Sequence, residues 1–254
     1  MPDVRLSFVI PAHNEEALIG ETLDAVLASI AAAMGIPRSD LWLPATAFEV
    51  IVADDASDDG TRVVLACYER EAGVRVVGCT GGTCAAARNA GAAASTGRIL
   101  CFVDADTVIP ETAVRSVLQH HERDNRCLVL YRLASREPGL RAWMWWTFWG
   151  LARHAPIDRA KSMPAFMSCD RAHFETYGPF EEAHAITEEW PVTRAAYRYH
   201  RKRFLYDRSI TARTSSRRME LQPFGYLRTY VKWTAAVLLP GARTAPVPRI
   251  RHER

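Results

Sequence analysis

The chain has 254 residues, of which 48% are hydrophobic and 24% charged, an ordinary balance that excludes a disordered chain as the default. This length suits one sizeable α/β domain with residues left over for a C-terminal appendage. The formal net charge of +3 hides an asymmetry, because residues 194–254 carry 15 Lys and Arg against 3 Asp and Glu, which leaves 17 against 26 in residues 1–193. A basic C-terminal segment suits a nucleic acid, an anionic lipid or a polyphosphate as partner.

The six cysteines form no CxxC pair, and several lie in apolar helix or strand patterns. We therefore expect reduced core thiols in a cytoplasmic protein, and neither a disulfide framework nor a zinc site. The N-terminus shows no secretory signal pattern, and no apolar run approaches the roughly 18 residues that a membrane-spanning helix needs. These features favour a cytoplasmic location and leave the inner face of the membrane open.

The first 130 residues alternate short β-branched runs with helical periodicity. Strands are expected at 5–10, 48–53, 74–78 and 98–103, and helices at 15–34, up to 72, at 83–95 and from Pro110 onward. Asn14 stands where an N-cap belongs and Gly35 where a helix ends. This alternation predicts an α/β fold with a Rossmann-like, mainly parallel sheet flanked by helices, whose ligands bind at the carboxyl ends of the strands.

Polar loops follow the four strands, at 11–16, 54–61, 80–91 and 104–107. The last of these loops begins with Asp104 and Asp106, one residue apart. In a strand, side chains at this spacing share a face, so the two carboxylates repel unless a cation or a ligand lies between them. Three interpretations stay open for this pair: a divalent-metal site, an aspartyl nucleophile with a general acid, or a solvated turn in which Asp104 caps a helix.

The pattern changes after Leu133. Residues 139–154 are compatible with a helix that carries four tryptophans, and further helices are expected near 171–177 and after 190. Core packing explains the tryptophans, and so does peripheral contact with a membrane through 139–153 and the apolar segment 224–239.

Four blocks in order resemble the family 2 glycosyltransferases: "VIPAHNEE", "VADDASDDGT", "ARNAGAAASTG" leading into "FVDAD", and the later "TEEW". The resemblance covers roughly residues 6–218 and implies an inverting enzyme with the GT-A fold. It implies that residues 1–133 bind a UDP- or GDP-sugar donor, that 134–218 bind the acceptor, and that 219–254 form an apolar and basic appendage. The implied acceptor is a hydroxyl group, either lipid-linked or on a cell-surface glycan precursor, and no nucleic acid is expected.

The same resemblance implies roles for individual residues. Asp106 coordinates Mg²⁺ or Mn²⁺ together with Asp104, because hard cations prefer oxygen ligands. Glu189 is the general base and Glu188 its neighbour, although the family usually has Asp at the second position. The remaining predictions fall into three groups: nucleotide contacts by Pro11, Ala12, Asn14, Glu15, Asp54, Asp55, Arg88, Asn89 and Asp104; a loop over the diphosphate with Ser216, Arg217 and Arg218; and acceptor contacts by Arg171, Phe174 and Trp190.

Two rival functions compete with this interpretation. "FVDADTV" also fits the first motif of haloacid dehalogenase-like phosphatases, although that family places it after the first strand and follows it with a Lys and an Asp pair. The second rival is a non-catalytic GT-A domain that binds a nucleotide and serves in assembly. It is motivated by Glu in place of Asp at position 189 and by the absence of the late His that many family members use as a metal ligand.

Overall fold

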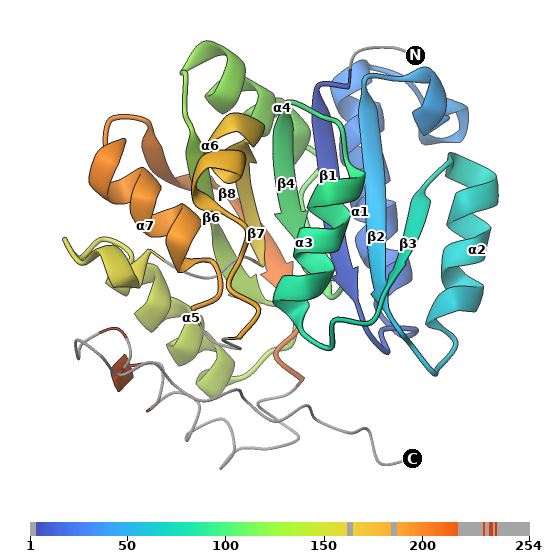
Figure 1. Ribbon diagram of the computed structural model, residues 1–254. Helices are drawn as coiled ribbons and strands as arrows, with labels where there is room; N and C mark the ends of the chain where they lie inside the picture. Colours follow the sequence, from blue (N-terminus) through green and yellow to red (C-terminus); the bar gives the residue numbers. More distant parts are fainter. Residues whose placement is uncertain are drawn as a thin grey trace.

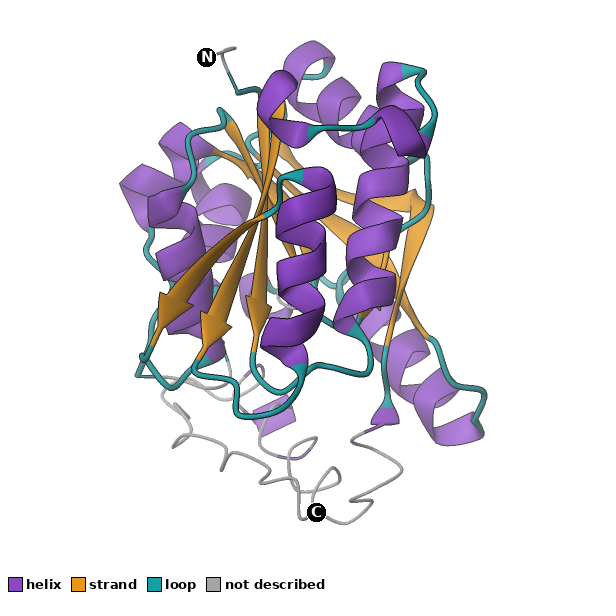
Figure 2. Ribbon diagram, turned by 90° about the vertical axis from the view of Figure 1, so that its right-hand side faces the viewer, coloured by secondary structure: helices purple, strands orange, loops and turns teal. Residues whose placement is uncertain are grey.

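The computed structural model describes residues 4–161, 165–183, 187–217 and, near the C-terminus, 231, 234, 235 and 237. These residues form an eight-stranded sheet in the order β3-β2-β1-β4-β7-β6-β8-β5. Helices cover both of its faces (Figures 1 and 2). The predicted α/β fold with a mainly parallel sheet is therefore confirmed. Most of the predicted appendage, residues 219–254, lies outside the described residues.

The first half supplies the parallel strands. They are β1 (Leu6–Ala12), β2 (Phe48–Asp55), β3 (Arg75–Cys79) and β4 (Ile99–Val103), and β1 pairs in parallel with both β2 and β4. All seven residues of β1 and all eight of β2 are buried, as expected for strands covered on both faces. The four predicted strands are confirmed within about two residues at each end.

The helices of this half are α1 (Ile19–Met34), α2 (Thr61–Ala72), α3 (Cys84–Ala94) and α4 (Ala113–Leu118). The apolar stripe predicted for α1 is buried, and Gly35 ends that helix with a φ of 71°. The prediction of Asn14 as N-cap is wrong, because α1 begins only at Ile19 and Asn14 adopts a left-handed turn with φ 55°. Likewise, α4 begins at Ala113, three residues after Pro110.

The second half adds β6 (Leu128–Ser135), β7 (Phe166–Asp170) and β8 (Phe204–Thr214), while the short β5 (Thr107–Val108) pairs with β8. Strand β7 is antiparallel to both β4 and β6, so it ends at the sheet edge where β4 begins. The helices are α5 (Leu140–Ala152), α6 (Arg171–Tyr177) and α7 (Trp190–Tyr199). Shorter turns are η1 (Arg38–Asp40), η2 (Leu43–Ala45), the π-helical η3 (Gln119–Arg123) and η4 (Asp158–Ala160).

Helix α3 packs directly on the sheet through buried positions that are mostly small. Thr83 caps its first turn by accepting a hydrogen bond from the Ala86 N–H at 3.1 Å. A Cβ on Gly91 would lie 2.5 Å from Cγ1 of Val9, so only glycine fits at this contact with β1. This close approach brings the polar side chains of α3 to the edge of the sheet.

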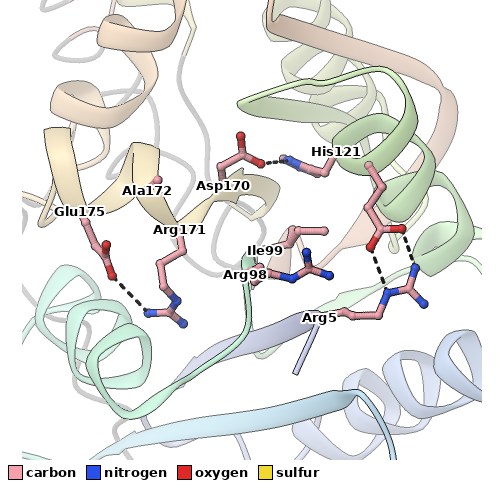
Figure 3. A pocket seen from close by; sticks show the side chains of 9 residues that line it. Arg5, Arg98, Ile99, His121, Asp170, Arg171, Ala172 and Glu175 are labelled. Carbon is pink, nitrogen blue, oxygen red and sulfur yellow. Dashed lines mark hydrogen bonds and ion pairs between the residues drawn. The ribbon is translucent and has the colours of Figure 1, made fainter. Parts of the chain in front are cut away.

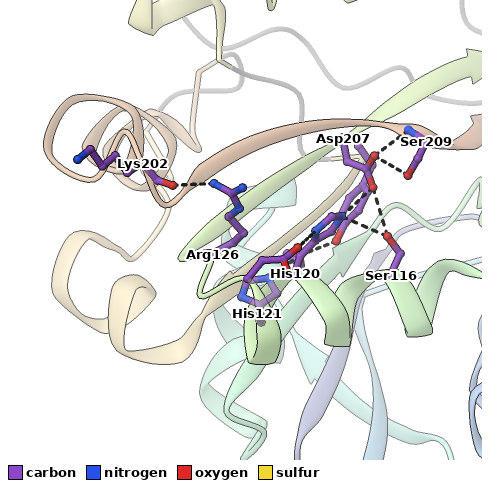
Figure 4. A network of polar contacts seen from close by, with 10 residues as sticks. Ser116, His120, His121, Arg126, Lys202, Asp207 and Ser209 are labelled. Atoms are coloured by element: carbon purple, nitrogen blue, oxygen red, sulfur yellow. Dashed lines mark hydrogen bonds and ion pairs between the residues drawn. The ribbon is translucent and has the colours of Figure 1, made fainter.

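A polar network fixes β8 to the helix formed by α4 and η3 (Figure 4). Nε2 of His120 lies 2.9 Å from a carboxylate oxygen of Asp207, and Ser116 donates to the same carboxylate at 3.2 Å. Ser209 donates to the other carboxylate oxygen at 2.7 Å. Because β8 leads directly into residues 215–217, this network helps to position that loop.

The six cysteines, all within the described part of the chain, are free thiols. Cys101, Cys127 and Cys169 are buried as predicted, whereas Cys67 and Cys84 are exposed and Cys79 is half-buried. None of the helices described is long and apolar enough to cross a bilayer.

Candidate active site

The polar segments predicted to converge do lie at one edge of the sheet. The loops after β1, β2, β3 and β4 leave it on the same side, because these strands run parallel. Two segments of the second half reach this edge as well. Glu188, just before α7, contacts Arg88 of α3, and the Ser215 N–H donates to the Asp106 carbonyl at 3.2 Å.

Arg88 joins the two halves of this edge. Its side chain is only 3% exposed; one terminal nitrogen donates to Oδ1 of Asp104 at 2.5 Å and the other donates to Oε1 of Glu188. Its Nε–H is buried with no hydrogen-bond partner among the described residues. Charge-assisted hydrogen bonds are stronger than neutral ones. The guanidinium therefore fixes the turn of Asp104 and Asp106, here called the DxD turn, relative to Glu188 and Glu189, here called the acid pair.

The acid pair is buried beside this guanidinium. Burial raises the pKa of Glu188 to about 7; Arg88 opposes this shift, whereas Glu189 and Asp104 reinforce it. Arg88 therefore contacts two carboxylates, and the Glu189 carboxylate adds a third negative charge near Glu188. A carboxyl group with a pKa near neutrality can gain or lose a proton at physiological pH, which suits general acid–base chemistry.

Glu189, the predicted base, has a different charged neighbour. It is 2% exposed and directly precedes α7, where its carbonyl accepts the Thr193 N–H at 3.0 Å. Arg153, buried just after α5, lies within electrostatic reach of its carboxylate. The two acids thus have different cations nearby: Arg88 pairs with Glu188, and Arg153 is within electrostatic reach of Glu189.

Asp104 and Asp106 lie in a turn beyond the end of β4. The Thr107 N–H donates to the Asp104 carbonyl at 3.0 Å, which closes the turn and removes the shared strand face. The Asp106 carboxylate accepts from the hydroxyl of Thr214 at 3.1 Å. Both aspartates are partly exposed, so their carboxylates border solvent.

The first loop is held onto the loop after β2. Nδ2 of Asn14 donates to the Asp58 carboxylate at 2.6 Å, and the Asp58 N–H donates back to Oδ1 of Asn14 at 2.9 Å. Pro11 and Ala12, which precede this loop, are buried as the last residues of β1. These contacts give the first loop a fixed shape before any ligand binds.

Asp54 and Asp55 end β2 with their carboxylates turned inward. Asp54 has no exposed surface; its oxygens accept from the Ser57 N–H at 3.2 Å and from Nε of Arg62 at 2.6 Å. Asp55 is 4% exposed and accepts the Gly82 N–H at 3.0 Å. Their assignment to the nucleotide base stays a prediction, and Asp54 has a structural role in the loop.

The segment after β8 packs against the first loop and α5. Arg217 donates to Oε2 of Glu15 at 2.5 Å, which ties this segment to the loop after β1. Ser216 is buried, where its hydroxyl accepts from Nε1 of Trp146 at 3.0 Å and its N–H donates to Glu137 at 2.6 Å. Arg218 lies outside the described residues.

The sequence model described as Glycosyl transferase family 2 matches residues 7–208, most of the chain. The chain belongs to glycosyl transferase family 2. The phosphatase alternative is therefore wrong, and the DxD pair after the fourth strand belongs to a glycosyltransferase.

Curated relatives match part of this family 2 glycosyltransferase. Validoxylamine A glucosyltransferase from Streptomyces hygroscopicus subsp. limoneus is 36% identical over 118 residues, which is 46% of this chain and 23% of the relative. The probable glycosyltransferase YdaM of Bacillus subtilis is 32% identical over 115 residues, 43% of this chain and 24% of the relative. The matched region thus spans about a quarter of the length of these relatives.

Solved structures share the fold. The mannosyltransferase PcManGT from Pyrobaculum calidifontis, in complex with GDP-Man and Mn²⁺, has a TM-score of 0.64 at 21% identity, covering 95% of this chain and 66% of that one. TarS 1–349 from S. aureus has a TM-score of 0.62 at 17% identity, covering 94% and 68%. At this level of identity the similarity shows the fold alone, and it confirms the GT-A architecture of this glycosyltransferase.

The DxD turn of this glycosyltransferase fits a divalent ion that a ligand helps to hold. In residues 4–161, 165–183 and 187–217, no three His, Cys, Asp or Glu side chains cluster closely enough to bind an ion by themselves. Mg²⁺ is commonly bound by one or two carboxylates together with substrate phosphates. Asp104 and Asp106, both bordering solvent, offer that donor set.

Three predicted residues contact other parts of the protein. Arg171 lies at the opposite edge of the sheet because β7 is antiparallel; it donates to the Gly97 carbonyl at 2.6 Å and lines a separate cavity of about 810 Å³ (Figure 3). Phe174 packs in the core, 5.5 Å from the ring of Phe102. Asn89 bonds both backbone groups of Phe180, at 2.9 and 3.0 Å. We therefore leave these three residues out of the proposed site.

Trp190 remains beside the acid pair but is buried. It packs with Trp145 and Trp149, and the Arg194 guanidinium lies 5.3 Å from the centre of its ring. Two further residues at this edge were not predicted: Arg153, which lies within electrostatic reach of Glu189, and Glu137, which accepts the Ser216 N–H. No signal in the chain marks them, because they reach the site only through the position of α5.

Proposed function

We propose that this chain transfers a sugar from a UDP- or GDP-sugar to an acceptor hydroxyl, with inversion at the anomeric carbon. The observation that carries the proposal is the Arg88 contact between Asp104 and Glu188, since it brings a DxD turn and a buried acid pair to one edge. Structural neighbours with bound UDP, UDP-GlcNAc and GDP-Man support the class of donor.

On the donor side, Asp104 and Asp106 would hold Mg²⁺ or Mn²⁺. The bound ion supplies Lewis-acid stabilisation of the charge that develops on the departing diphosphate. Arg217 adds positive charge from the late loop, and Arg218 is assigned there with it, because guanidinium groups match phosphate oxygens bidentately. When a nucleotide binds, Glu15 would release Arg217 and contact the nucleotide instead. Asp54 and Asp55 are both assigned to the edge of the base, and Asp54 also forms an ion pair with Arg62.

On the acceptor side, the acid pair divides two roles. Glu189 takes the proton as the acceptor oxygen bonds to the anomeric carbon and the bond from that carbon to the phosphate oxygen breaks. The nucleoside diphosphate leaves with that electron pair. Glu188, held by Arg88, is a positioning residue that keeps the pair oriented toward the donor. A single displacement from the face opposite the leaving group gives inversion.

We place the acceptor hydroxyl on a lipid-linked or cell-surface glycan precursor. Trp190, next to Glu189, packs on Trp145 and Trp149 of α5, so an apolar helix borders the acid pair. An acceptor with an apolar portion would find a complementary surface there.

The test is transfer and donor hydrolysis with UDP-, GDP- and dTDP-sugars in Mn²⁺ or Mg²⁺. We expect Asp106→Ala and Glu189→Gln each to lower turnover by at least about 100-fold, because proton transfer and charge stabilisation each contribute factors of this size. Asp40→Ala and Glu175→Gln are matched controls, since both residues are exposed. Neither contacts the catalytic edge, which is the sheet edge that carries the DxD turn and the acid pair.

Two results would contradict the proposal. Turnover unaffected by Asp106→Ala would remove the metal role of the DxD turn. Nucleotide binding without transfer or hydrolysis for every donor would favour a non-catalytic assembly protein, the alternative raised by the Glu at position 189. Loss in Glu188→Gln with full activity in Glu189→Gln would exchange the roles of the two acids.

A further inference from the structure

The outer face of α5 is apolar and open to solvent. The described part of the chain exposes ten large hydrophobic side chains, and five of them lie on this one 13-residue helix. Trp143 is 63% exposed and Leu151 68% exposed. The five share one side of the helix at spacings of three and four residues. They are Leu140, Trp143, Met144, Phe148 and Leu151.

Core packing accounts only for the opposite side of α5. There Ala142, Trp145 and Trp149 pack with Trp190 and with Val237 of the C-terminal segment. The structure therefore divides the tryptophans that the sequence left undecided: Trp145 and Trp149 face inward and Trp143 faces outward. A helix that covers a domain in water normally carries polar side chains on its outer side. An apolar patch there marks a binding surface.

Charge indicates what covers this patch. No acidic residue occurs between Glu137 and Asp158, and the exposed Arg141 stands at the first turn of α5. Residues 194–254 add 15 Lys and Arg against 3 Asp and Glu, and Val237 from that segment packs beside α5. The exposed Arg141 on α5 and the basic C-terminal sequence, together with exposed Trp, Phe and Leu on α5, match an anionic lipid surface, in which aromatic side chains settle at the headgroup level.

Length indicates the geometry of the contact. Thirteen residues of helix extend about 20 Å, too short to span the roughly 30 Å hydrocarbon core of a bilayer. We propose that α5 docks this protein on an anionic bilayer, with the helix lying along the surface and its five exposed apolar side chains inserted into the interface.

Such docking would bring the bilayer to the catalytic edge. Trp146 of α5 donates to Ser216 of the late loop at 3.0 Å, and Trp190 links α5 to the acid pair. Figure 1 shows α5 at the end of the molecule where β1 and β2 finish. This consequence rests on the proposed function, and it would explain an acceptor delivered from the membrane. The docking itself does not depend on turnover.

The test is co-sedimentation of the full chain with vesicles of phosphatidylcholine alone and of phosphatidylcholine mixed with phosphatidylglycerol. We expect binding to the anionic vesicles that weakens with salt. The double variant Trp143→Ser/Phe148→Ser should lower the partition coefficient at least about tenfold, because each buried aromatic side chain contributes more than the 1.4 kcal/mol of a tenfold change. Trp42→Ser/Val63→Ser is the matched control, since both residues are exposed outside α5 and should leave binding unchanged.

Three results would overturn the proposal. They are no binding to anionic vesicles, equal binding of the α5 variant and wild type, and an α5-dependent dimer in analytical ultracentrifugation without vesicle binding. The second result would assign the attraction to the basic C-terminal segment, and the third would make α5 an interface between copies. Circular dichroism confirms that both variants fold. Because sedimentation needs no donor or acceptor, its failure is distinct from a failure of the glycosyltransferase assay.

Discussion

Replacing Glu188 by Gln tests whether this acid is uncharged in the folded protein at low pH. Glu188 has a pKa of about 7 against an ordinary value of 4.5, chiefly because it is buried. A carboxyl whose pKa is raised on folding favours the folded state while it is protonated. That contribution is fully present below about pH 4.5 and is lost as the pH rises through 7.

The size of the effect follows from the shift. Between pH 5 and pH 8 the deprotonation of Glu188 should remove about 2 to 3 kcal/mol from the free energy of unfolding of the wild type. Gln keeps the side-chain size and can still accept the Arg88 hydrogen bond, but it does not ionise. The stability of Glu188→Gln relative to wild type should therefore rise by this amount over that range, which is about 5 to 10 °C in Tm for a chain of this length.

The assay is urea unfolding at pH 5, 6, 7 and 8 for the wild type, Glu188→Gln and the control Glu175→Gln. Glu175 has a side chain that is 64% exposed, so its replacement should change the pH dependence by less than about 0.5 kcal/mol. Parallel pH profiles for the wild type and Glu188→Gln would refute the reasoning. They would mean that Arg88 keeps Glu188 ionised and that the proton resides elsewhere in the cluster.

Three further outcomes test the donor site and the packing around it. Mn²⁺ with UDP or GDP at about 100 times Kd should stabilise the wild type by about 2.7 kcal/mol in a thermal-shift assay, and Asp106→Asn should abolish this stabilisation; an undiminished shift would contradict the metal role. Gly91→Val should cost about 1 to 3 kcal/mol in urea unfolding, because a Cβ there lies 2.5 Å from Cγ1 of Val9, and an unchanged midpoint would show that α3 can move away. His120→Ala should cost about 1 to 3 kcal/mol by leaving the buried Asp207 without its 2.9 Å partner, and a neutral result would remove this network as an anchor of β8.

Local sequence patterns predicted the first half of the fold well. The β-branched run 48–53 predicts a buried strand, and the apolar stripe of α1 predicts the side of the helix that is buried. The parallel order then brought Arg88, Asp104 and the first loop to one edge, since parallel strands all finish on the same side. Gly35 was predictable as a helix end, because its φ of 71° suits glycine.

The errors arise where distant segments decide the structure. Asn14 is a residue type that often caps helices, yet its side chain hydrogen-bonds to Asp58, which is 44 positions away. The direction of β7 depends on pairing with β4 and β6, and a five-residue apolar strand carries no mark of its direction. Arg171, predicted to contact the acceptor, therefore lies at the opposite edge of the sheet from the acid pair. In α5 both sides are apolar, so periodicity could not tell which tryptophans face the core.

The position of the acid pair follows from two adjacent side chains of α3. Arg88 reaches Glu188, and Asn89 bonds the backbone of Phe180 and the side chain of Glu182, so one turn of helix contacts residues that precede the acid pair as well as the pair itself. Both contacts require α3 to lie close to the sheet. The alanines of "CAAARNAGAAA" and the contact of Gly91 with β1 permit that approach, whereas larger side chains would lift the helix away. The alanine-rich composition of α3 is therefore a condition for the catalytic geometry, because it lets residues from the donor half position the acids of the acceptor half.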